Sequence, residues 1–188
     1  MAKRAEKAAA TRQRILDATQ ELFAARSADF TLDNVAALAG TSVQTVLRAF
    51  GTKEGLILAA IGTFRATVPP RDERPQSVGE AVARLVDDYE QIGDRVISML
   101  AEEHRIPGFA AAAAEGRTRH RAWVEAAFAE QLAVHPARRR TQVLVALLGA
   151  TDVYVWKLFR RDLGLGRSAS QTAIERLVRG ALITNPGE

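Results

Sequence analysis

Residues 31–56 read TLDNVAALAGTSVQTVLRAFGTKEGL, and this stretch contains start and stop signals for two short helices. Thr31 is a favourable N-cap for the first helix, and Gly40 follows it as a residue that readily adopts the left-handed conformation at a helix C-terminus. Ser42 can cap the second helix, which Gly51 ends. Two short helices joined by a glycine-containing turn are typical of a helix-turn-helix, whose second helix enters the DNA major groove.

The second of these helices separates inward from outward side chains. Val46 and Phe50 lie four residues apart, so both can face the core. Gln44 and Thr45 then point outward, where they can contact base edges or phosphates, and Val43 can touch a thymine methyl group. The alternative is a small helical hairpin that never contacts DNA, because short helices with a glycine turn are common.

Residues 11–61 resemble the DNA-binding domain of TetR-family regulators. The agreement in order and spacing covers Glu21-Leu22-Phe23, Thr31, Val35-Ala36, Ala39-Gly40, Ser42, Thr45-Val46, Phe50 and Lys53-Glu54-Gly55-Leu56. The resemblance implies phosphate contacts at Thr31, Thr45 and Lys53, and base-facing side chains at Val43 and Gln44. With the basic residues added, the predicted DNA-binding set is Thr31, Ser42, Val43, Gln44, Thr45, Leu47, Arg48, Lys53, Arg4 and Lys7.

The chain departs from the family pattern at two positions of the second helix. Family members usually carry Tyr where this chain has Leu47, and His or Tyr where it has Ala49. The loss of a phenolic hydroxyl removes a phosphate hydrogen bond worth about 1 kcal/mol. Arg48 and the basic N-terminal segment can offset that loss. Ser27 also replaces the Gly that is common in the turn after the first helix.

Positive charge is concentrated at the N-terminus. Lys3, Arg4, Lys7, Arg12 and Arg14 are balanced only by Glu6 within the first 14 residues, although the whole chain carries a net charge of only +4. Such an arm, over residues 1–10, can neutralise DNA phosphates with release of counterions. A solvated, disordered tail is the alternative. Lys53 and the free N–H groups that open its helix can bind a further phosphate.

The composition excludes several other classes of protein. The 188 residues include no cysteine, so disulfides, thiolate metal sites and a cysteine nucleophile are excluded, in keeping with a cytoplasmic protein. No apolar run approaches the roughly 18 residues of a membrane span, and no secretory signal follows the basic start. His104, His120 and His135 form no zinc motif, and the sequence has no phosphate-binding glycine loop. Glu102-Glu103-His104 is expected at the surface. We therefore predict neither an enzyme nor a bound cofactor or metal.

Helical spacing dominates the rest of the chain, which predicts an all-α protein of nine or ten helices. A proline-rich linker over 69–75 separates a helix-turn-helix domain, 1–66, from a helical ligand-binding and dimerisation domain, 67–188. The helices expected in the N-terminal domain cover 11–26, 32–39, 43–49 and 53–66. Those of the C-terminal domain begin with a capping box at Ser77 and a break at Gly93, followed by 107–116, 118–134, 136–163 and a last helix capped by Ser168.

The helix predicted over 136–163 is apolar on all sides, and such a helix must be buried on all sides. A small domain can cover one face, so the opposite face needs a partner. We therefore predict a homodimer through the helices near 118–134 and 136–163, as the resemblance also implies. The alternative is a central core helix in a monomer.

A small-molecule effector site in the C-terminal domain is implied by the resemblance. Candidate lining residues combine aromatic, soft and polar groups, and they are Tyr89, Met99, Glu103, Phe109, His120, Trp123 and Trp156. For each of them, plain core packing is the alternative interpretation. The predicted function is a ligand-controlled repressor that binds a palindromic DNA operator as a dimer. The alternative function is a dimeric ligand-binding or protein-interaction module without operator binding.

Overall fold

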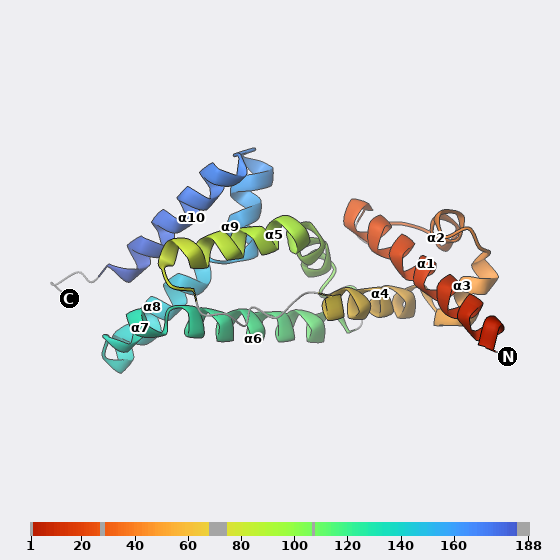
Figure 1. Ribbon diagram of the computed structural model, residues 1–188, viewed down its shortest axis with the longest axis horizontal. Coiled ribbons are helices and arrows are strands. Elements are labelled where there is room, and N and C mark those ends of the chain that lie inside the picture. The colour runs from red at the N-terminus through yellow and green to blue at the C-terminus, as the bar shows by residue number, and fades with distance from the viewer. Residues whose placement is uncertain (1, 27–28, 68–74, 107, 184–188) are drawn as a thin grey trace. The chain divides into compact units, whose positions relative to one another are not determined.

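The computed structural model describes residues 2–26, 29–67, 75–106 and 108–183. These residues form ten α-helices and one π-helical turn, and no strand, so the all-α prediction is confirmed. They divide into two compact units. One comprises residues 1–70 and 98–113, and we call it the head; the other comprises residues 71–97 and 114–188, and we call it the body. Helices α5 and α6 each contribute residues to both units, because residues 98–113 belong to the head. The ten α-helices follow one another along the chain as labelled in Figure 1.

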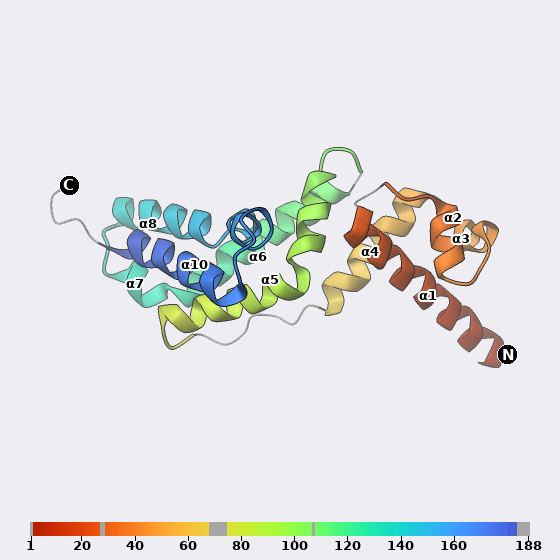
Figure 2. The same ribbon diagram turned by 90° about the horizontal axis from the view of Figure 1, so that it is seen from above.

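The head contains four helices: α1 (Ala2–Arg26), α2 (Leu32–Leu38), α3 (Val43–Phe50) and α4 (Lys53–Thr67). Helix α1 packs against α2 and α4, and α3 packs against both α2 and α4 (Figure 2). Ile15, Val35 and Leu56 are fully buried at the centre of this arrangement. The chain after α5 closes the core, since the Phe109 ring meets Phe23 edge-on with 5.8 Å between ring centroids. The sequence did not indicate this contribution.

The body contains the rest of α5 (Val78–Ala101) and α6 (Phe109–Ala127), with α7 (Ala129–Ala133), α8 (Ala137–Ala150), α9 (Val153–Lys157), the π turn η1 (Leu158–Asp162) and α10 (Arg167–Leu182). Helix α8 packs along α10 and against α7. Tyr89 of α5 donates a hydrogen bond to the carbonyl of Thr151, which joins α5 to the end of α8.

Two predicted helix breaks are wrong. Helix α5 runs without interruption through Gly93, which is buried and has no room for a Cβ, because a Cβ there would lie 2.4 Å from the Trp156 ring. This glycine therefore serves close packing between helices rather than termination of one. Helix α6 likewise continues through Gly116, which lies mid-helix beside open space, and it ends instead before Phe128.

The helix predicted over 136–163 is in fact broken in two. Helix α8 ends at Ala150, and the carboxylate of Asp152 caps α9 by accepting the N–H of Tyr154 at 2.8 Å. Its apolar residues are also not buried on every side within one chain, since Val145 is 60% and Tyr154 is 52% exposed. The single chain thus covers one side of these helices and leaves apolar residues exposed on another, as expected if that side needs a partner.

Capping was predicted correctly at one end of the body and wrongly at the other. The Ser77 hydroxyl accepts the N–H of Glu80 at 3.1 Å, which is half of the predicted capping box. The Glu80 carboxylate accepts the N–H of Gln76 rather than that of Ser77, so the second half of the box does not form. Helix α10 begins earlier than predicted, with Gly166 as its N-cap, so Ser168 lies inside the helix. The first turn forms without a side-chain cap.

By length and composition alone, Ala137–Asp162 would be able to cross a membrane, and it is the one such stretch in the described part of the chain. Val143, Leu147 and Trp156 from this stretch are buried in the protein interior. Burial of this kind is that of a core helix, and the break after Ala150 interrupts the stretch.

Candidate nucleic-acid interface

Helix α2 begins with a complete capping box. The Thr31 hydroxyl accepts the N–H of Asn34 at 3.2 Å, and the Asn34 side chain accepts the N–H of Thr31 at 2.9 Å. Two N–H groups that the first turn would leave unpaired are thus satisfied. The predicted cap at Thr31 is confirmed, and its side chain lies at the exposed start of the helix.

The turn between α2 and α3 has the predicted chemistry. Gly40 adopts a φ of 61°, in the left-handed region where a glycine carries no steric penalty. Ser42 then caps α3 by accepting the N–H of Thr45 at 3.2 Å, and the two hydroxyls bond each other at 2.9 Å. The turn and the first residues of α3 are therefore held by several local hydrogen bonds.

Helix α3 exposes Gln44, as predicted, whereas Thr45, also predicted to point outward, is half-buried. Val46 is 1% exposed and anchors the helix in the head core, while Gln44 and Arg48 are exposed on the other side. Leu47 is 40% exposed. Val43 is half-buried against the head core. Its side chain is therefore less accessible to a base than the side chain of Gln44, which is exposed.

The start of α4 brings Lys53 close to the same turn. Its ammonium group lies 4.8 Å from the centre of the Phe30 ring, which fixes the position of the cation without removing its charge. The Thr52 hydroxyl accepts the N–H of Gly55 at 3.0 Å and caps the helix. Gly55 has no room for a side chain, because a Cβ there would lie 2.6 Å from the carbonyl oxygen of Phe50. The pKa of the Glu54 carboxyl is lowered by hydrogen bonds from its own backbone N–H and from Thr52.

The N-terminal arm is helical. Helix α1 begins at Ala2, so the residues before the predicted start at 11 extend the same helix, and a disordered tail is not what the structure shows. Lys3, Arg4 and Lys7 are exposed along it. The arm therefore presents its charges from a regular scaffold.

Two further arginines of α1 join the helix-turn-helix by contacts that the sequence did not reveal. Arg12 donates to the carbonyl of Ala49 at 2.9 Å, near the end of α3. Arg14 donates to the carbonyl of Ala39 at 3.2 Å, at the end of α2. Each cation thus meets the negative end of a helix dipole. The sequence signal was only the local charge excess, because such contacts link residues 25 or more positions apart.

The predicted effector-site residues do not form one group. Met99 and Phe109 belong to the head core. Glu103 is half-buried in the chain that follows α5. Its neighbour Glu102 is buried, contrary to the expectation of a surface position, with Arg105 Nη1 at 3.1 Å from its carboxylate. Ile106, whose N–H bonds the Glu102 carbonyl at 3.1 Å, packs in the head core, so Glu102 lies beside buried residues.

The other predicted residues meet inside the body, around the joint between α8 and α9. His120 bonds the Thr151 hydroxyl at 3.0 Å and stacks on Trp123, with 5.9 Å between ring centroids. Trp156 is fully buried and lies 6.0 Å from the Tyr89 ring. These four side chains, Tyr89, His120, Trp123 and Trp156, therefore line one polar and aromatic region of the interior.

An ion pair lies at the edge of this region. The Glu90 carboxylate accepts both the Trp156 indole N–H, at 3.0 Å, and two N–H groups of Arg160, at 2.6 and 2.9 Å. The hydrogen bond from Arg160 is the main cause that lowers the pKa of Glu90 to about 2. Glu90 is therefore charged at neutral pH and fixes the indole in place.

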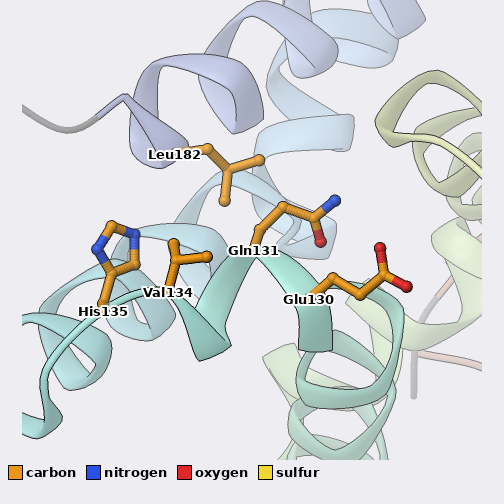
Figure 3. A pocket seen from close by; sticks show the side chains of 5 residues that line it. All are labelled: Glu130, Gln131, Val134, His135 and Leu182. Atoms are coloured by element: carbon orange, nitrogen blue, oxygen red, sulfur yellow. The ribbon is translucent and has the colours of Figure 1, made fainter.

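An open depression lies elsewhere in the body. It has a volume of about 340 Å³. The residues that line it are Glu130, Gln131, Val134, His135 and Leu182 (Figure 3). None of the predicted effector-site residues lines it. It is formed by α7, the residues that follow it and the end of α10.

The capped turn, the buried Val46 and the exposed Gln44 and Arg48 together define a helix-turn-helix DNA-binding domain. Residues 15–60, which lie within the head, match the family described as bacterial regulatory proteins, tetR family. The match supports a DNA-binding domain of the TetR type in the head, and hence a DNA-binding transcriptional regulator; proteins of that family are regulators rather than enzymes. No curated protein matches the sequence closely enough to count as a relative.

Proposed function

We propose that this protein is a cytoplasmic repressor that binds a palindromic DNA operator as a homodimer and is released by a small-molecule effector. The observation that carries the proposal is the exposure of Gln44 and Arg48 on a helix whose opposite side is locked by Val46. Gln can bond adenine and Arg can bond guanine in the major groove. The sites expected to contact the backbone are Thr31, Thr45, Lys53 and the arm.

The dimer is supported by an apolar surface on α8 and α10, two helices that pack along each other. Val145 on α8 is 60% exposed and Leu177 on α10 is 45% exposed. Small residues beside them, Ala146, Gly149 and Gly180, are exposed as well and would allow close helix approach. We propose that this surface packs against its copy in a four-helix bundle. Helix α8 belongs to the predicted interface, whereas α10 replaces the segment 118–134 in this proposal.

Substitutions can locate the dimer interface. Val145→Lys places a charge on the proposed surface and is expected to shift the protein to monomers in sedimentation experiments. Ala126→Lys places the same charge on an exposed position of α6, within the segment 118–134, and is expected to leave the dimer intact. The reverse result would place the interface on 118–134.

An effector response is supported by the continuity of two helices. Since α5 and α6 each contribute residues to head and body, a ligand that shifts them in the body also changes residues of the head. Such a ligand acts only through a higher affinity for the form that does not bind DNA. The polar and aromatic region around Thr151 offers contacts for a ligand of mixed polarity.

A gel-shift experiment with the DNA that flanks the protein's own gene tests the proposal. We expect a specific complex that unlabelled flanking DNA displaces and that mixed-sequence DNA does not. If no specific complex forms even at low salt, the module without operator binding becomes the better interpretation. Native mass spectrometry of the purified protein is expected to show a dimer, and any co-purified small molecule would identify the effector class.

A further inference from the structure

Arg12 contacts both a carbonyl and an aromatic ring of the recognition helix. Its side chain lies on α1 but reaches α3, where Nη1 donates to the Ala49 carbonyl at 2.9 Å and the guanidinium group lies 4.2 Å from the centre of the Phe50 ring. The residue is nevertheless exposed. The guanidinium group is therefore held at the C-terminal end of the recognition helix while part of it faces solvent.

The contacts of Arg12 leave its charge uncompensated. Three arginines of the body are paired with carboxylates, Arg160 with Glu90, Arg161 with Asp94 and Arg167 with Asp87, whereas Arg140 donates to the carbonyls of Leu132 and His135. Among the residues that the structure describes, the partners of Arg12 are a carbonyl and an aromatic ring, which are both neutral. A guanidinium group carries five N–H donors, and one of them is used here. A fixed cation with free donors is suited to an anion.

The position on α3 indicates which anion. The exposed side chains near the end of this helix include Leu47 and Ala49, which have no polar group, and Arg48. Leu47 and Ala49 therefore offer no side-chain hydrogen-bond donor to a duplex that lies against α3. Arg12 supplies such a donor from the neighbouring helix, beside the carbonyl of Ala49.

We propose that Arg12 binds a phosphate of the DNA backbone next to the C-terminal end of α3. The Ala49 carbonyl and the Phe50 ring hold the guanidinium group before DNA arrives, so little side-chain freedom is lost on binding. The remaining N–H groups form charge-assisted hydrogen bonds to the phosphate oxygens. This inference rests on the DNA binding proposed above and adds a residue that the predicted set does not contain.

The dependence of DNA affinity on salt concentration tests this contact. The full-length protein is titrated onto a fluorescently labelled duplex of mixed sequence, because phosphate contacts do not need an operator, and the affinity is measured across a range of salt concentrations. For Arg12→Gln we expect the slope of log affinity against log salt to fall by about 0.9 for each Arg12 engaged, and the affinity at 0.1 M salt to fall about eightfold for each Arg12 engaged. Arg119→Gln removes the same charge from an exposed residue of α6 in the body and is expected to leave the slope unchanged.

Arg12→Lys separates a phosphate contact from a purely structural role. Lysine keeps the charge but loses the planar fork, so we expect the slope of the wild type with a lower affinity. Circular dichroism melts check that both variants stay folded. If Arg12→Gln weakens binding with an unchanged slope, or if the slope also falls in Arg12→Lys, Arg12 only supports α3 and the inference is wrong. Failure of the wild type to bind the duplex at any salt would instead refute DNA binding itself.

Discussion

Gly93→Ala is the substitution whose effect the structure defines most closely. A Cβ at this position would lie 2.4, 2.7 and 2.8 Å from three carbon atoms of the Trp156 ring. The ring would have to retreat by about 1 Å to reach ordinary van der Waals contact. It cannot retreat freely, because its N–H is bonded to Glu90 and the Arg161 guanidinium lies 4.5 Å from the ring.

The expected cost follows from these contacts. Overpacking a filled core costs about 1 to 3 kcal/mol, and loss of the indole hydrogen bond adds about 1 kcal/mol. The higher helix propensity of alanine offsets about 1 kcal/mol of this loss in the free energy of unfolding. The net result is about 2 kcal/mol of destabilisation, which lowers the melting temperature of a chain of this size by about 4 to 8 °C.

The assay is thermal unfolding followed by circular dichroism at one protein concentration, because a dimer melts at a temperature that depends on concentration. Gly116→Ala is the matched control, since Gly116 also lies mid-helix but has nothing within 4 Å of a Cβ. It is expected to gain about 0.5 to 1 kcal/mol. If Gly93→Ala raises the melting temperature as Gly116→Ala does, the packing of Trp156 against α5 is not as described.

Three other substitutions test the body and the head. Glu90→Gln is expected to lose about 2 to 3 kcal/mol at pH 7, because the pKa of Glu90 is lowered from 4.5 to about 2 in the folded protein. That stabilisation is fully present above pH 5 and disappears as the pH falls toward 2. Urea unfolding across this range should therefore show that the difference in stability between variant and wild type vanishes at low pH. A difference that stays constant with pH would argue against the ion pair with Arg160. Gly55→Ala is expected to destabilise the head by about 1 to 3 kcal/mol in thermal unfolding, because its Cβ would meet the Phe50 carbonyl, whereas Gly62→Ala on the same helix has open space and should be neutral or stabilising. Ser42→Ala removes the N-cap of α3 and should cost about 1 kcal/mol, with Ser42→Gly costing only a few tenths; equal losses in the two variants would contradict a capping role.

The sequence predicted those parts of the fold that depend on neighbouring residues. Caps, turns and periodicity act over a few positions, so Thr31, Gly40 and Ser42 could be placed correctly from the sequence alone. The outward direction of Gln44 followed from helical spacing once Val46 was assigned to the core. These are the same residues that define the candidate DNA-binding surface.

The sequence could not reveal contacts between distant residues. A glycine within a helical pattern commonly indicates the end of the helix. The reason that Gly93 lies inside a continuous helix is the Trp156 ring, which is 63 positions later in the chain. The link from Arg12 to Ala49 and the burial of Glu102 depend in the same way on tertiary packing. The predicted effector-site residues failed to form one group because Phe109 packs in the head core, far along the chain from its partner Phe23.

Selection of bound duplexes from a random-sequence library tests most directly whether α3 reads DNA. The wild type is expected to enrich a palindrome whose half-sites are centred about 34 Å apart, or a multiple of that distance. Gln44→Ala is expected to lose the preference at one matched base pair in each half-site while it still binds the backbone. Enrichment of no sequence by the wild type, or an identical preference in the variant, would contradict the assignment of α3 as the recognition helix.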